Sequence, residues 1–186
     1  MGPCFATMFF RKRLAFALIV LVIPSIADDT LELPVITVCE VLKDMSAYNG
    51  QTVIVVGRLG GSSEGSWLDA DCPQRVVQNG IEWDTIIALA DVRGQAEPPS
   101  LSKGFHWNDQ LLLKKVSELK PMTVLQAVPK IHYRDEWAAV FGRFETHPLD
   151  SREDGFGHLA GSPARLIWPE KGVHILHAKA QRWVTF

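Results

Sequence analysis

The sequence predicts a mainly β domain of the α+β class, in which two helices accompany a small closed barrel and a signal peptide precedes it. Stretches rich in β-branched residues recur along the chain, separated by glycine, proline and serine. Glycines interrupt the long stretches, and a small sheet needs such bends to close into a barrel. With 186 residues, 47% of them hydrophobic, the chain is long enough for one domain with a substantial core.

An export signal is the most specific local pattern. Three basic residues, 11–13, precede ten apolar residues without a charge, 14–23, and small residues occupy the −3 and −1 positions of a cleavage site after Ala27. Ten apolar residues fall short of the ~20 that a membrane-spanning helix needs. We therefore expect residues 1–27 to be a cleaved signal peptide, residues 28–186 to form one secreted or periplasmic domain, and no membrane span to remain.

Cleavage changes the charge and the cysteine content of the chain. The mature domain keeps 16 basic and 21 acidic residues, a net charge of −5, which disfavours nucleic acid as a partner because phosphate backbones attract basic surfaces. It also keeps two cysteines, Cys39 and Cys72, and an even pair in an exported chain predicts a disulfide. Two buried free thiols are the alternative.

Local signals define the elements of the N-terminal half. Thr37 and Glu40 fit a capping box and are followed by apolar residues at helical spacing, so a helix is predicted over 38–48. A strongly β-branched strand is predicted over 51–59, and Gly57 within it indicates a bulge or a tight bend. Two further strands are predicted over 66–68 and 84–90.

The C-terminal half begins with an insert over 92–120, a loop followed by a helix. Residues 92–105 are rich in glycine, proline and serine, and Asn108 is placed to cap a helix that ends before Pro121. The strands predicted beyond the insert cover 122–129, 136–146, 165–168, 173–177 and 183–186.

A short pattern occurs twice, as VVGRL at 55–59 and VFGRF at 140–144. Each copy is a strand that contains Gly-Arg and is followed by a polar, glycine-containing loop. Two matches of five residues are compatible with chance. They also fit two long bent strands of one barrel that place Arg58 and Arg143 on the same face.

The stretch over 38–68 resembles the opening of small OB-like domains, with a short helix carrying YNG, a strand of the form VxVxGxL, and then EGxxL. Together with GRFET, GFGHL and PARLIW, residues 36–178 resemble a family of secreted bacterial proteins of unknown function. The resemblance implies an OB-like β-barrel and export, and it carries no activity. The insert over 92–120 departs from common OB domains, and its helix is expected to close one end of the barrel.

Aromatic and arginine side chains are the candidates for binding, because exposed aromatics on the sheet face of OB-type barrels stack bases or sugar rings. The chain has six tryptophans, and core positions are expected for most of them. Trp67 and Trp107 lie beside glycine, serine, histidine or asparagine, which indicates exposure. Trp67, Arg58 and Arg143 form the predicted ligand site, and both arginines also fit ion pairs with acidic residues on the barrel surface.

The stretch GFGHL, 155–159, supplies the fourth predicted ligand residue, His158. A phosphate-binding loop would lead into a helix, whereas Pro163 and a strand follow here, so we expect a bend with a positive φ at one or both glycines. No catalytic residue, metal set or cofactor is predicted. The chain lacks a G-x-S-x-G motif, and His174 and His177 fall on opposite faces of a predicted strand.

These patterns favour a non-catalytic binding or envelope-associated module over an enzyme. The expected partner is an unidentified small molecule, a glycan or an envelope protein. The alternative is a secreted hydrolase that uses a histidine–carboxylate site around His158, which requires an acidic side chain within hydrogen-bonding reach of that imidazole.

Overall fold

The computed structural model describes residues 33–63, 65–90, 97–119, 132–157, 160–177 and 182–186. The helices are α1 (Val38–Lys43), α2 (Met45–Tyr48) and α3 (Asp109–Glu118), and a 3-10 turn covers Arg152–Asp154. The first six strands are β1 (Val35–Thr37), β2 (Thr52–Ser62), β3 (Gly65–Asp69), β4 (Val76–Gln78), β5 (Ile81–Trp83) and β6 (Ile86–Ala90). The remaining strands are β7 (His132–Glu145), β8 (Arg165–Ile167), β9 (Val173–His177) and β10 (Arg182–Thr185).

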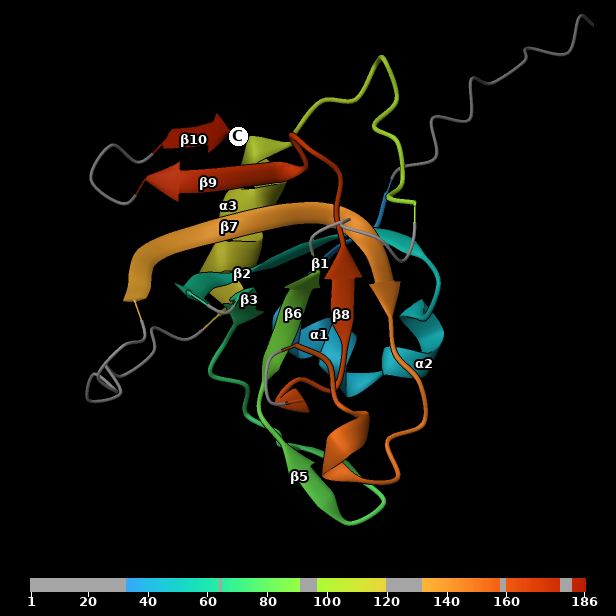
Figure 1. The fold of residues 1–186 in the computed structure, drawn as a ribbon. Coiled ribbons are helices and arrows are strands. Elements are labelled where there is room, and N and C mark those ends of the chain that lie inside the picture. The colour runs from blue at the N-terminus through green and yellow to red at the C-terminus, as the bar shows by residue number, and fades with distance from the viewer. Residues whose placement is uncertain (1–32, 64, 91–96, 120–131, 158–159, 178–181) are drawn as a thin grey trace, which may run out of the picture. The chain divides into compact units, whose positions relative to one another are not determined.

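Five of these strands close a barrel in the described part of the chain. They are hydrogen-bonded in the order β2-β3-β6-β8-β7, and β7 pairs again with β2 to complete the ring. The pairs are antiparallel except for β6 and β8, which run parallel. This mainly β, closed five-stranded barrel confirms the predicted fold class and is consistent with an OB-like fold (Figure 1).

Three α-helices occur among the described residues, one more than predicted. The helix predicted over 38–48 divides at Asp44, whose φ of −141° and ψ of 65° are not helical. The Asp44 carboxylate accepts a hydrogen bond from the backbone N–H of Ala47, so the residue that ends α1 also caps α2. The predicted capping box is confirmed, since Thr37 and Glu40 exchange side chain–backbone hydrogen bonds. The strand predicted over 122–129 lies outside the described residues.

Strand β7 belongs to two parts of the sheet. Its residues up to Val140 pair with β9, and its residues from Arg143 on pair with β8, so the strand curves from the paired strands β9 and β10 into the barrel (Figure 1). Gly142 lies at the change of partner, where a Cβ would come within 2.6 Å of the Ile167 carbonyl oxygen. On β2 the pairing shifts register between Arg58 and Gly60, which confirms the irregularity predicted near Gly57.

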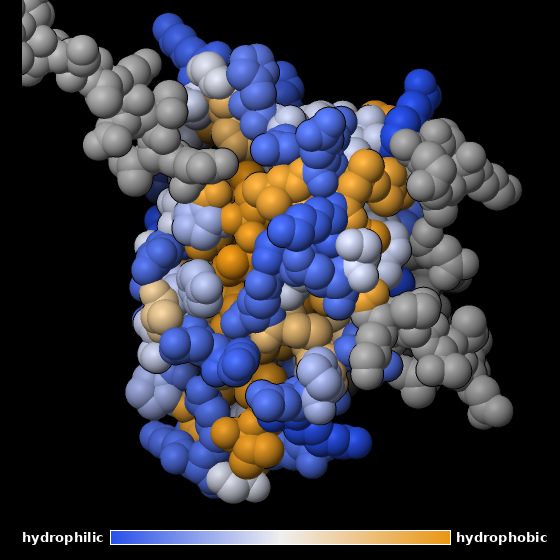
Figure 2. Space-filling model, turned by 180° about the vertical axis from the view of Figure 1, so that it is seen from behind, coloured by the Kyte–Doolittle hydropathy of each residue, from blue (hydrophilic) through white to orange (hydrophobic). Residues whose placement is uncertain are grey.

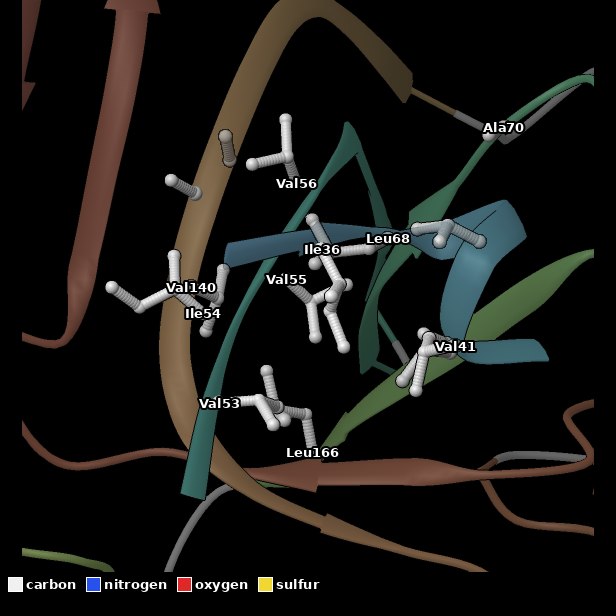
Figure 3. Packing of buried hydrophobic residues seen from close by; sticks show 14 of the residues in the cluster. Ile36, Val41, Val53, Ile54, Val55, Val56, Leu68, Ala70, Val140 and Leu166 are labelled. Carbon is white, nitrogen blue, oxygen red and sulfur yellow. The ribbon is translucent and has the colours of Figure 1, made fainter. Parts of the chain in front are cut away.

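Alternate side chains of β2 point into the barrel and pack against α1. Val53 and Val55 are fully buried and lie on the same side as Val41 of α1 (Figure 3). Gly57 continues the series, and a Cβ there would lie 2.6 Å from a methyl group of Val38. Side chains of α1 therefore pack closely against the inward side of β2, and this contact requires glycine at this point of the strand.

The outward side chains of β2 are also covered. Ile54 pairs with Phe141 of β7, and the Phe141 ring lies 5.6 Å from that of Phe105 in the insert. Helix α3 packs against β1 and β2. The resemblance placed the helix of the insert at an end of the barrel; in the structure α1 is the helix that packs against inward-facing residues of β2.

The disulfide between Cys39 and Cys72 is present, as predicted, and joins α1 to the segment before β4. Strands β4 and β5 form a separate hairpin for which no prediction was made. Its turn residues, Asn79 and Gly80, have φ values of 50° and 78°, the left-handed pair that a two-residue hairpin requires.

Hydrophobic residues also reach the surface. On the face opposite to that of Figure 1 they lie along the middle and are crossed and flanked by hydrophilic residues (Figure 2). The most exposed large ones in the described ranges are Val77 on β4, Phe186 at the C-terminus and Leu113 on α3. Within the same ranges, no helix combines the length and the apolar composition that crossing a bilayer requires.

Candidate functional site

Four barrel strands place a row of side chains on one outward face. The strand pairing aligns Trp67 with Ala88, Ala88 with Arg165, and Arg165 with Glu145. The residues next to this row along the strands, such as Leu68 and Leu166, are fully buried, so the row itself faces outward. Neighbouring strands lie about 4.8 Å apart, which puts the backbones of Trp67 and Arg165 about 10 Å from each other.

Trp67 forms one end of the row and is half-buried. Its indole lies over Gly60, the residue opposite it on β2, where a Cβ would come within 2.3 Å of the indole nitrogen. The same side chain hydrogen-bonds the carboxylate of Asp69. The absence of a side chain at position 60 and the bond to Asp69 together fix the orientation of the indole.

Arg58 and Asp69 form an ion pair beside Trp67. They are cross-strand partners on β2 and β3, Arg58 Nε lies 3.3 Å from Asp69 Oδ1, and the side chains are only 12% and 6% exposed. Burial raises the pKa of Asp69 more than the attraction and the hydrogen bonds of Arg58 and Trp67 lower it. The pair therefore joins two barrel strands and offers little surface to a ligand.

Glu145 holds two arginines at the other end of the row. Its Oε1 accepts from Arg143 Nε over 3.0 Å, and its Oε2 accepts from Arg165 Nε and Nη2 over 2.9 and 2.7 Å. Burial would raise the pKa of Glu145, but the hydrogen bonds from Arg165 and Arg143 outweigh it and leave the pKa lowered. Arg143 also donates to the carbonyl of Glu97. Both guanidinium groups are fixed in orientation while 29% of Arg143 and 26% of Arg165 remain exposed.

The loop between β7 and β8 crosses the middle of the row. Gly157 has a φ of 78°, which confirms the predicted glycine bend, and a Cβ there would lie 3.3 Å from that of Ala88. The loop is tied down by Ser162, whose hydroxyl accepts from the backbone N–H of Ala88 over 3.1 Å. Ala88 is consequently buried, and Trp67 and Arg165 lie on either side of the covered residue.

Phe156 extends the arginine end of the row. Its half-buried ring has the guanidinium carbon of Arg165 5.2 Å from its centroid, a cation–π distance. The exposed His147 meets the same ring edge-on, with centroids 4.5 Å apart, and its Nε2 lies 2.6 Å from the carbonyl oxygen of Asp154. An aromatic ring, two guanidinium groups and one carboxylate thus meet on one surface.

The structure brings only some of the predicted ligand residues together. Arg58 and Arg143 lie on the same face, as the repeated pattern predicted, but their positions on the β2–β7 pair are six residues, or about 20 Å, apart. Trp67 lies beside Arg58. His158 lies outside the described residues, so its role stays a prediction. Glu145, Arg165 and Phe156 were not predicted, because cross-strand register cannot be read from a single strand.

A histidine–carboxylate pair occurs elsewhere in the fold. His174 is 6% exposed, its Nε2 lies 3.1 Å from Asp109 Oδ1, and its Nδ1 lies 2.8 Å from the hydroxyl of Thr185. Trp107 and Trp183 stack on its two faces, with centroids 4.8 and 5.1 Å away. Burial lowers the pKa of His174 more than Asp109 raises it. The imidazole is therefore enclosed in a structural contact and is not open to a substrate.

Comparisons with known proteins do not extend this picture: no family model, curated protein or solved structure matches the chain. Within the ranges that the structure describes, no three histidine, cysteine, aspartate or glutamate side chains are grouped to hold a metal ion.

Proposed function

We propose that the chain is an exported, non-catalytic binding module whose ligand is a glycan. The ligand site is the arginine–aromatic face, which we define as Trp67, Arg143, Glu145, Phe156 and Arg165. The observation that carries the proposal is the Glu145 carboxylate held between two partly exposed guanidinium groups, one of which lies over Phe156. The face belongs to a closed barrel of OB-like topology, a class in which the sheet face and its adjoining loops bind oligosaccharides or oligonucleotides.

The chemistry of the face suits a sugar. Hydroxyl groups accept hydrogen bonds from guanidinium groups and donate them to a carboxylate, and aromatic rings pack against the apolar face of a pyranose. Because Glu145 already orients both arginines, binding costs little side-chain entropy. A polyanion such as nucleic acid is disfavoured by the net charge of −5 predicted for the mature chain.

Export is part of the proposal. The disulfide between Cys39 and Cys72 supports it, since such bonds persist in oxidising compartments. The predicted signal over 1–27 and the resemblance to secreted bacterial proteins agree with a secreted or periplasmic location. Mass spectrometry of the protein recovered from the culture medium or from a periplasmic extract tests this directly: the mass of a chain that begins at Asp28 is expected, and retention of residues 1–27 would contradict it.

An array of neutral and uronic-acid-containing oligosaccharides tests the ligand assignment. We expect a subset to bind and to be recovered intact. Arg165→Gln should weaken that binding at least about tenfold, since a hydrogen bond to a charged group contributes about 1.5–3 kcal/mol. Arg152→Gln is the matched control, because it removes an exposed arginine that lies against Trp83 and outside the defined face. Equal binding by both variants, or no oligosaccharide bound at all, would refute the proposal.

A further inference from the structure

A groove of about 500 Å³, lined by no residue of the arginine–aromatic face, lies between two segments that the disulfide joins. One wall is formed by residues within 39–46, from α1 and α2, and the other by residues 72–78, which include β4. Its volume falls in the range of pockets that hold small ligands or peptide side chains.

The second wall includes the edge of strand β4, whose three residues all line the groove. Every residue from Cys72 to Gln78 lines the groove. When a strand turns one face to a cavity, every second residue lines the cavity, whereas a strand that borders it with its edge lines it with consecutive residues. In the part of the chain that is described, β4 pairs only with β5. Its other edge therefore borders the groove.

Val77 supplies the hydrogen-bonding groups of that edge. Gln78 and Ile81 flank the two-residue turn and form the hydrogen-bonded pair that closes such a hairpin. Val77, paired with Glu82, occupies the next position, where the backbone N–H and C=O point away from the partner strand. Val77 is 59% exposed, the most of any large hydrophobic residue described.

The groove has an apolar base. Leu42, Met45 and Val76, which line it, are each more than 90% buried, and the disulfide lies beside them. Because the Cys39 and Cys72 Cα atoms are 5.3 Å apart, the bond fixes the separation of the two walls at that point. An apolar side chain that entered here would meet a surface that is already shaped.

Among the charged residues that line the groove, Lys43 is the one cation without an ion pair in the described part of the chain. Glu40 is paired with Lys115 and Arg75 with Glu82, while Asp44 caps α2. Lys43 is exposed and makes no ion pair or hydrogen bond with any residue in the described ranges. A ligand that complements this surface carries an acidic group at the Lys43 end.

We propose that this groove binds an extended peptide segment of a partner protein, which adds to β4 as a further strand. Main-chain hydrogen bonds form with Val77, an apolar side chain of the peptide packs on Leu42 and Met45, and an acidic side chain lies near Lys43. Strand addition at a free edge beside a helix is an established way to recognise peptides, with affinity from the backbone and specificity from the side-chain pocket. The inference is independent of the glycan proposal, since it uses a different surface.

A display library of random twelve-residue peptides, selected against the intact exported protein, tests the inference. Enriched peptides should alternate β-branched with other residues and carry an acidic residue near one end. In calorimetry with synthetic copies of these peptides, Val77→Pro should weaken binding at least tenfold, because it removes the N–H that points into the groove. The β4–β5 hairpin is expected to survive, since that N–H is not part of its ladder.

Two variants separate the contributions. Val77→Thr keeps the backbone donor and the branched shape, so binding should stay within about threefold of the unchanged protein. Lys43→Glu should reverse the charge preference, so that selection against this variant enriches basic peptides. A reversed preference cannot arise from a folding defect.

Three results would overturn the inference. The first is that the selection enriches no peptide, and the second is that the enriched peptides bind Val77→Pro as tightly as the unchanged protein. The third is that the protein forms a dimer by itself and Val77→Pro abolishes the dimer, which would assign the groove to a second copy. Oligosaccharide binding should be the same in Val77→Pro and in the unchanged protein, so failure of one proposal does not decide the other.

Discussion

His174 Nε2 and Asp109 Oδ1 lie 3.1 Å apart and join β9 to the first residue of α3. An ionised carboxylate only accepts hydrogen bonds, so Nε2 carries the proton of the imidazole. The other nitrogen, Nδ1, accepts from the Thr185 hydroxyl in the neutral ring. A single uncharged histidine thus ties the insert and the C-terminal strand to the barrel.

This contact predicts a loss of stability in mild acid. Burial, partly offset by Asp109, lowers the pKa of His174 below the ordinary value of about 6.5. Below pH 6.5 the unfolded chain therefore binds a proton that the folded chain does not, and the free energy of unfolding falls as the pH drops towards the lowered native pKa. Urea unfolding between pH 5 and 8 should show this slope in the unchanged protein and a smaller one in His174→Gln. Parallel pH profiles of the two proteins would disprove the assignment.

Removing Arg58 from its ion pair with Asp69 should lower the free energy of unfolding by an amount that depends on pH. Arg58→Met leaves the buried Asp69 without its main counter-charge and should lower the free energy of unfolding by about 3 kcal/mol at neutral pH. The loss should shrink in acid, where Asp69 takes up a proton, because its pKa is already raised. The double variant Arg58→Met, Asp69→Leu should recover much of the stability in denaturant titrations. A double variant no more stable than Arg58→Met would contradict a buried ion pair.

A side chain at position 142, where β7 changes partner, should clash with the neighbouring strand. Gly142→Ala would bring a methyl group to 2.6 Å from a backbone oxygen and should destabilise the protein by about 1–3 kcal/mol. Gly104→Ala is the control, since its added methyl group meets nothing within 4 Å, and it should be neutral or slightly stabilising. Thermal unfolding of both variants measures the difference. Similar melting temperatures would show that β7 does not approach β8 this closely.

Removal of the disulfide should lower the free energy of unfolding substantially. Cys39 and Cys72 close a loop with a sequence separation of 33, for which the chain-entropy model gives about 4 kcal/mol. Urea unfolding with and without a reducing agent should show a loss of that size, and the paired Cys39→Ser, Cys72→Ser variant should show it without a reducing agent. A thiol titration that finds these two cysteines free in protein purified without a reducing agent would rule out the bond.

Features that depend on a few neighbouring residues could be predicted from the sequence. The capping box of Thr37 and Glu40 correctly predicted the start of α1, and Asn108 caps α3 as expected. Runs of β-branched residues predicted the positions of most strands. The β4–β5 hairpin was missed although Asn79-Gly80 is a strong hairpin signal, because the strands beside it are only three residues long.

The candidate site could be predicted only in part. The repeated Gly-Arg pattern correctly indicated that Arg58 and Arg143 share a face, since side-chain direction alternates along a strand. The contact between Glu145 and Arg165 depends on the register of β7 against β8. That register is set by packing in the core of the whole barrel. The loop that covers Ala88 is likewise set by tertiary contacts.

The ring of strands also constrains the order in which the chain can fold. Strand β8 is the only neighbour that β6 shares with β7 within the described chain, and it lies about 20 residues from the C-terminus. Contacts between strands so distant in sequence make folding slow. A nascent chain that has not yet released residue 167 presents two open sheet edges, the surfaces through which β proteins aggregate. Closure of the barrel therefore waits for residues 165–167, the last part of the ring to be synthesised.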